Sequence, residues 1–282
     1  MVGAMGFSLL AAVVASCHGG GVVTRCGVDT AMLQNAAVPD LPGAPMIPWM
    51  GTLDRARLYS LMSQATNYRE FGAGSSTVLA ATRFRNIRSI MSTDSDEKVV
   101  RNLLARADVA PEADSGRLVL RHADVGPVDL WGTPTDSRKS SMWPAYSSYN
   151  GSWSDFNPPF WFDMVFVNGH FRVACLLKAL KATAPSHISN TVFAVHHYVP
   201  RSIAWRLPAS GVTQVVDTIM MQFADRVELP AQQIPEQWVN MSREENYAVY
   251  DNDNVLTILR KRADCDEMEL DKAIAKWERE IQ

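Results

Sequence analysis

The feature that most constrains this chain is a short segment at residues 67–71 that passes directly into a glycine turn at residues 72–74. Residues 67–71 are predicted to form a strand, the turn Gly72-Ala73-Gly74 closes it, and residues 75–83 are predicted to continue as a helix. Glycines in such a turn let the backbone bend tightly and approach a nucleotide-like ligand closely. The segment therefore predicts one unit of an α/β domain with a ligand site at its turn.

Predicted strands and helices alternate along the rest of the chain. Thr52 is predicted to cap a first helix, and the last helix carries an apolar stripe at Leu270, Ile274, Trp277 and Ile281. The further strands are predicted at 87–91, 118–120, 162–167, 192–195, near Val227 and at 255–259, and the helices at 52–65, 97–107, 171–182, 212–223 and 267–281. Some central strands contain continuous apolar runs, as at residues 192–195, and such runs are typical of a sheet that is covered on both faces. The pattern predicts an α/β fold with a mainly parallel sheet and helices on both faces.

Composition fits one large domain without a strong electrostatic field. The chain has 282 residues, 47% of them hydrophobic, and a formal net charge of −3, so no nucleic-acid partner is expected. The four cysteines are far apart and show no metal-binding spacing, so no metal is predicted. Cys175 lies in an apolar helical run and is expected to be a free, buried thiol.

Residues 1–50 are predicted to be separate from the domain at 51–282. Residues 5–16 are apolar but too short for an ordinary membrane span, and residues 40–48 form a proline-rich linker. The segment resembles a signal sequence, an organelle-targeting remnant or a docking segment, and the residues do not decide among these. Secretory, organellar and membrane-associated locations stay open, with residues 5–16 as the part that would contact a membrane.

An aromatic insertion is predicted at about 127–160. Long irregular segments inside an α/β domain usually have a function. The insertion could fold over a substrate, bind a protein partner through the loop from Trp131 to Trp153, or cover the sheet edge. Its large aromatic residues are Trp131, Trp143, Tyr146, Tyr149, Trp153 and Phe156.

The carboxyl ends of the predicted parallel strands should meet in one crevice. The loops at 72–75, 94–96, 122–126, 168–170 and 196–198 would line it. An acid about 20 residues after the glycine turn can accept hydrogen bonds from ribose hydroxyls, and Asp94 has that position. Thr77 stands where a dinucleotide-binding turn needs a third glycine, which disfavours an NAD-dependent oxidoreductase.

Several motifs together resemble one family. The run from Glu70 to Thr77, EFGAGSST, is similar to the first motif of class I S-adenosylmethionine (SAM)-dependent methyltransferases. The chain resembles more closely a methyltransferase-like branch that also carries stretches like Asp124-Val125-Gly126-Pro127, Trp131-Gly132 and the run from Val167 to Cys175, VNGHFRVAC. The resemblance extends from about Leu53 to the last helix and implies a Rossmann-like fold that binds SAM.

The resemblance also implies roles for individual residues. Glu70 and the backbone of Gly72 and Gly74 would face the methionine part of SAM, Asp94 would hold the ribose, and Asp124 would lie near the adenine. Asn168 would complete the cofactor site.

Two positions depart from the family pattern. Asn168 stands where relatives have an aspartate, and His197 follows His196 where relatives have His-Asp. Asparagine can form hydrogen bonds but cannot act as a general base, so metal-assisted transfer is disfavoured. Transfer driven by proximity remains open, because the sulfonium of SAM is an activated donor. His170 and His196 are the candidate catalytic bases, with a structural hydrogen-bonding role as the alternative.

The sequence thus supports two hypotheses. One is a SAM-dependent methyltransferase with an unidentified acceptor. The other is a catalytically silent methyltransferase-fold subunit with a structural role in a larger, organellar or membrane-associated assembly.

Overall fold

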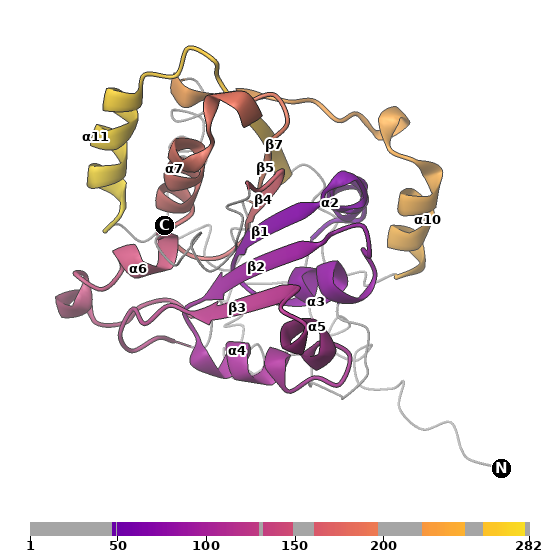
Figure 1. The fold of residues 1–282 in the computed structure, drawn as a ribbon, viewed down its shortest axis with the longest axis horizontal. Helices are drawn as coiled ribbons and strands as arrows, with labels where there is room; N and C mark the ends of the chain where they lie inside the picture. The colour runs from indigo at the N-terminus through magenta and orange to yellow at the C-terminus, as the bar shows by residue number, and fades with distance from the viewer. Residues whose placement is uncertain are drawn as a thin grey trace, which may run out of the picture. The chain divides into compact units, whose positions relative to one another are not determined.

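The computed structural model describes residues 47–48, 50–129, 132–148, 161–196, 222–245 and 256–279. In this part of the chain one sheet has the strand order β3-β2-β1-β4-β5-β7-β6 (Figure 1). Strands β1 to β5 pair in parallel, and β7 runs antiparallel to both of its neighbours. The strands are β1 (Asn67–Phe71), β2 (Ser89–Asp94), β3 (Leu118–His122), β4 (Met164–Val167), β5 (Val192–His196), β6 (Ala224–Arg226) and β7 (Leu256–Lys261).

Helices cover both faces of this sheet (Figure 1). They are α2 (Thr52–Gln64), α3 (Ser75–Thr82), α4 (Glu97–Leu104), α5 (Ala110–Asp114), α6 (Pro144–Ser147), α7 (Arg172–Ala182), α10 (Glu236–Glu244) and α11 (Glu267–Trp277). Short 3-10 helices occur at Ser137–Lys139, Pro185–His187 and Ala231–Gln233. The predicted α/β fold, with a mainly parallel sheet between two helical layers, is confirmed.

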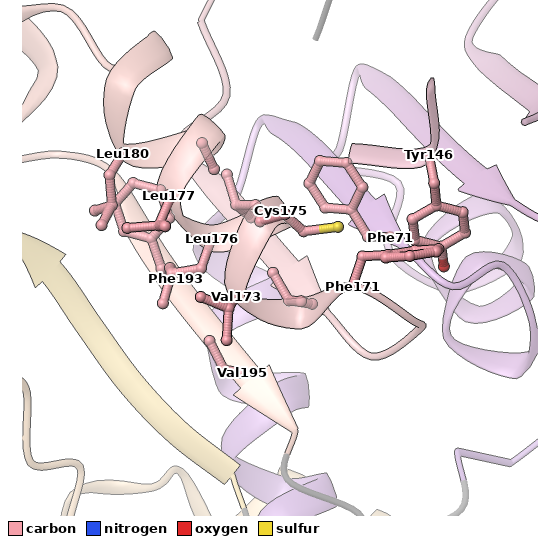
Figure 2. Packing of buried hydrophobic residues seen from close by; sticks show 14 of the residues in the cluster. Phe71, Tyr146, Phe171, Val173, Cys175, Leu176, Leu177, Leu180, Phe193 and Val195 are labelled. Atoms are coloured by element: carbon pink, nitrogen blue, oxygen red, sulfur yellow. The ribbon is translucent and has the colours of Figure 1, made fainter. Parts of the chain in front are cut away.

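Each face of the sheet has its own hydrophobic core. Phe166 of β4 packs with Tyr68 and residues of α2 and α3, whereas its neighbour Val167 packs with α7 on the other face. This alternation follows from the two-residue period of a strand. Figure 2 shows the core on the α7 face of the sheet, in which Leu176 and Leu177 lie near Phe193.

Cys175 and the last helix fulfil their predictions. Cys175 is a free, fully buried thiol in the α7 core, and burial raises the pKa of its thiol well above the usual range. Leu270 of α11 is fully buried, and Ile274 and Trp277 pack on the same core. None of the helices in the described ranges is long and apolar enough to cross a membrane.

Some boundaries differ from the predictions. Thr52 is the first residue of α2 and not its cap, because Gly51 holds the cap position and no side chain bonds there. Strand β2 begins at Ser89 and not at residue 87, since the Ile87 amide bonds to Phe84 in the turn after α3. Helices α5 and α10 were not predicted. The expected helix at 212–223 lies almost wholly outside the described residues, as do residues 1–46, Trp131, Trp153 and His197.

Candidate functional site

The glycine turn after β1 lies between the ends of β2 and β4. The Gly72 amide donates to the Thr93 carbonyl at 2.8 Å, and the Gly169 amide donates to the Phe71 carbonyl at 2.7 Å. Gly72 has φ +101°, and a Cβ atom there would lie 2.5 Å from the Gly169 nitrogen. Gly72 is therefore required by both its backbone conformation and the close approach of the β4 turn.

The Glu70 carboxylate connects the end of β1 to the start of α3. It is fully buried and accepts hydrogen bonds from the hydroxyls of Ser76 and Thr77, the latter at 2.5 Å. Burial raises the pKa of Glu70 to about 7, although the two hydroxyls oppose the shift. The Glu70 side chain thus joins the end of β1 to the start of α3, and its predicted position facing the methionine part of SAM stays a prediction.

Asp94 ends β2 beside the same turn. Its carboxylate accepts hydrogen bonds from the backbone amides of Asp96, at 2.8 Å, and of Ala73. Burial raises the pKa of Asp94 to about 6, and these amides hold it down. The hydrogen bond from the Ala73 amide places the Asp94 carboxylate, the predicted partner of the ribose, directly against the glycine turn.

Asp124 lies just beyond the end of β3. Its side chain is exposed and accepts a hydrogen bond from the Gly126 amide at 2.9 Å. The amide of Ala123 donates to the carbonyl of Asp94 at 2.8 Å, so the β3 loop is joined to the β2 loop.

Asn168 and His196 come together at the ends of β4 and β5. Oδ1 of Asn168 lies 2.8 Å from Nδ1 of His196, which is 1% exposed. An amide oxygen only accepts hydrogen bonds, so this contact requires the imidazole hydrogen on Nδ1 and leaves the lone pair on Nε2. The backbone amide of Asn168 also donates a hydrogen bond to the Phe71 carbonyl oxygen, at 2.8 Å.

His170, the other candidate base, is held differently. Its backbone amide donates to the Tyr146 hydroxyl at 3.3 Å, and the two rings meet edge to face. The next residue, Phe171, has φ 54°, a left-handed conformation that is rare for a bulky side chain. This turn aims the start of α7 at the same edge of the sheet.

The sequence did not predict how the insertion reaches this crevice. Ser95 donates to the carbonyl oxygen of Gly132 at 2.7 Å, and the Tyr146 hydroxyl lies against Gly169. Only the aromatic composition of the insertion indicated an interaction of this kind. Its described part covers the sheet edge through Trp143 and Tyr146, which pack on Phe171.

The loops at 72–75, 94–96, 122–126 and 168–170 and His196 thus form one connected group, as predicted for a common crevice. Among the described residues, no group of three histidine, cysteine, aspartate or glutamate side chains is placed to hold a metal ion.

Comparisons with known proteins agree at the level of the fold. No protein-family model matches the chain, and no curated protein sequence matches it. A methyltransferase-like protein from Silicibacter pomeroyi is 18% identical, with a TM-score of 0.52 over 81% of this chain and 97% of that chain. The chain has the class I SAM-dependent methyltransferase fold that its motifs resemble.

Two further solved structures are similar at lower scores. An N-methyltransferase from Bradyrhizobium japonicum is 12% identical, with a TM-score of 0.39 over 74% of this chain and 96% of that chain. An O-methyltransferase from Bacillus cereus, solved in complex with S-adenosylhomocysteine (SAH), is 14% identical, with a TM-score of 0.36 over 82% of this chain and 87% of that chain.

Proposed function

We propose that this protein binds SAM at the carboxyl edge of the sheet and transfers its methyl group to an acceptor that is not identified. The observation that carries the proposal is the space beside Gly74. No described atom comes within 4 Å of a Cβ atom built on Gly74, and its φ of 175° suits any residue. Protein packing explains Gly72 but not Gly74, and close approach of a ligand to the first turn of α3 would explain it.

The surrounding residues supply the polar groups that such a ligand needs. The Asp94 carboxylate would accept hydrogen bonds from the ribose hydroxyls, and its pKa of about 6 leaves it mainly ionised at neutral pH. Asp124 is exposed beyond β3 and available to the adenine. When bound, SAM supplies an activated methyl group, so the chain has to orient the acceptor and remove its proton.

Two histidines are the proposed proton acceptors. Asn168 orients His196 so that Nε2 carries the lone pair, and His170 lies on the turn after β4. The neutral Asn168 acts as a positioning residue in this scheme, since it cannot accept the proton itself.

Calorimetric titration with SAH tests the proposal. The wild-type protein should bind SAH, and Gly74→Ala should weaken binding about tenfold or more, with a loss of stability of no more than about 1 kcal/mol because alanine is a poorer N-cap than glycine. Gly116→Ala is the control for a loss of stability without loss of binding, because Gly116 lies before β3, away from the glycine turn, and its φ of +75° strains an alanine there although the Cβ atom meets open space. No detectable heat from the wild-type protein at millimolar SAH would overturn the proposal.

A second candidate is a methyltransferase fold that has lost catalysis and serves a larger assembly. It is favoured by the neutral Asn168, whose oxygen is already bonded to His196. Incubation of cell extract with methyl-labelled SAM separates the two. A labelled product that needs wild-type protein and is lost with Gly74→Ala supports the enzyme. SAH binding without any labelled product supports the second candidate.

A further inference from the structure

We propose that residues 132–146, the crevice strap, close the SAM site and compete with the cofactor for it. This inference rests on the proposed function, since it concerns the same crevice. The described residues of the strap contact the crevice at two points, one at each end of the segment.

The first point of contact is Gly132. Its carbonyl oxygen accepts the 2.7 Å hydrogen bond from Ser95, and a Cβ atom on Gly132 would lie 2.9 Å from Ser95 Oγ and 3.5 Å from His170 Nε2. Ser95 follows β2 and His170 follows β4, with β1 between these strands in the sheet. The Gly132 backbone therefore lies near the loops that follow β2 and β4, the two strands that flank β1.

The second point of contact is Tyr146. This side chain is fully buried, and a Cβ atom on Gly169 would overlap its hydroxyl and lie 2.8 Å from the Gly72 Cα. Figure 2 shows the Tyr146 ring beside Phe171 and close to Phe71. The hydroxyl thus lies where the turns after β1 and β4 meet.

Electrostatics agree with this position. Burial, and then the nearby Asp94 carboxylate, raise the pKa of Tyr146 well above its usual value.

The closed strap and a cofactor cannot both occupy this space. A ligand that extends from Asp94 to Asn168 has to pass between the β2 and β4 loops, which Gly132 and Tyr146 contact.

The middle of the strap buries little surface, although both of its ends are buried. Thr135, Ser137, Arg138, Lys139 and Ser141 are exposed, and the side chain of Arg138 is 87% accessible. Segments with little buried apolar surface open at low free-energy cost. Opening at the Gly132 end has to break the side-chain hydrogen bond from Ser95.

Variants on both sides of that bond test the strap. Ser95→Ala removes the donor, and Gly132→Ala places a Cβ atom against Ser95 at a residue with φ +79°. Both substitutions are expected to weaken the closed form only. Each variant should therefore bind SAH about two- to tenfold more tightly than the wild type, because one neutral hydrogen bond contributes a free energy of that size. Ser141→Ala, exposed on the same strap, should bind like the wild type.

Hydrogen exchange of the wild-type protein gives a second readout that needs no variant. Amides of residues 132–146 should exchange faster when SAH is added. Slower exchange, or unchanged affinity in both Ser95→Ala and Gly132→Ala, would overturn the strap and leave SAM binding intact. Absence of SAH binding in the wild type and in all the variants would overturn the proposed function itself.

Discussion

Nδ1 of His196 lies 2.8 Å from Oδ1 of Asn168 because parallel strands bring the two residues to the same level. Val167 of β4 pairs with Val195 of β5, so the residues that follow them are neighbours. Asn168, which stands where a carboxylate was expected, therefore has a structural role. It fixes the hydrogen of a buried imidazole and leaves Nε2 as the basic nitrogen.

Loss of this bond should be measurable as loss of stability. Asn168→Ala leaves the buried Nδ1–H of His196 without its acceptor and should lower the free energy of unfolding by about 1–3 kcal/mol. Urea denaturation measures the change. Asn102→Ala, exposed on α4, is the control and should stay within about 0.5 kcal/mol of the wild type. Equal losses in the two variants would contradict the assignment.

Gly169→Ala should be destabilising for steric reasons. The added Cβ atom meets the Tyr146 hydroxyl and the Gly72 backbone, and overpacking of this kind costs about 1–3 kcal/mol. Thermal or urea denaturation of the single variant and of Gly169→Ala combined with Tyr146→Phe gives the coupling. The double variant should recover part of the loss. If Tyr146→Phe recovers nothing, the hydroxyl does not touch Gly169 in solution.

Local patterns were enough to predict the sheet and one edge of the site. Strand β1 has the predicted bounds, because its segment passes directly into the glycine turn. Asp94 was predicted to close the second strand and it ends β2, although both predicted bounds of that strand, 87 and 91, were wrong. Parallel strands bring their carboxyl ends together, so the meeting of the β4 and β5 loops at Asn168 and His196 also followed from the sequence.

Contacts between distant segments were beyond the sequence patterns. Helix α10 is polar and is held against α2 by Arg55, whose guanidinium donates to the Ser242 carbonyl at 2.9 Å across 187 residues. The contact from Ser95 to Gly132 depends on the path of an irregular loop. No periodicity encodes such a path, which is why the sequence left three alternatives for the insertion.

Arg117 should be among the most important single side chains for stability. Its guanidinium donates to the carbonyls of Ile87, Ala81 and Phe84 at 2.7, 2.7 and 3.0 Å, and so caps the end of α3. Arg117→Met leaves these acceptors unsatisfied and should cost about 2–4 kcal/mol in urea denaturation. The stability of Arg117→Lys should lie between that of the wild type and that of Arg117→Met, because the lysine ammonium group cannot reach all of these carbonyls at once.

Arg101→Met is the matched control for Arg117. Arg101 is exposed on α4, so its replacement should change the free energy of unfolding by no more than about 0.5 kcal/mol. A loss in Arg117→Met no larger than in Arg101→Met would show that the carbonyls of α3 find other partners.

Glu70 should make the stability of this protein fall as the pH rises. Its pKa is raised from 4.5 to about 7 by burial, so the folded state binds the proton more tightly than the unfolded state. The stabilisation by protonated Glu70 is complete below pH 4.5 and is lost as the pH rises through 7. The shift corresponds to about 3 kcal/mol between pH 5 and 8.

Glu70→Gln removes this dependence, because an amide does not titrate. Urea denaturation at several pH values should show similar stability of variant and wild type at pH 5, and a variant that is more stable by up to about 3 kcal/mol at pH 8. Asp94 is present in both proteins, so its own titration cancels. Glu97→Gln, at the exposed start of α4, should keep the wild-type slope. Parallel curves for wild type and Glu70→Gln would mean that the Glu70 carboxylate is solvated in solution.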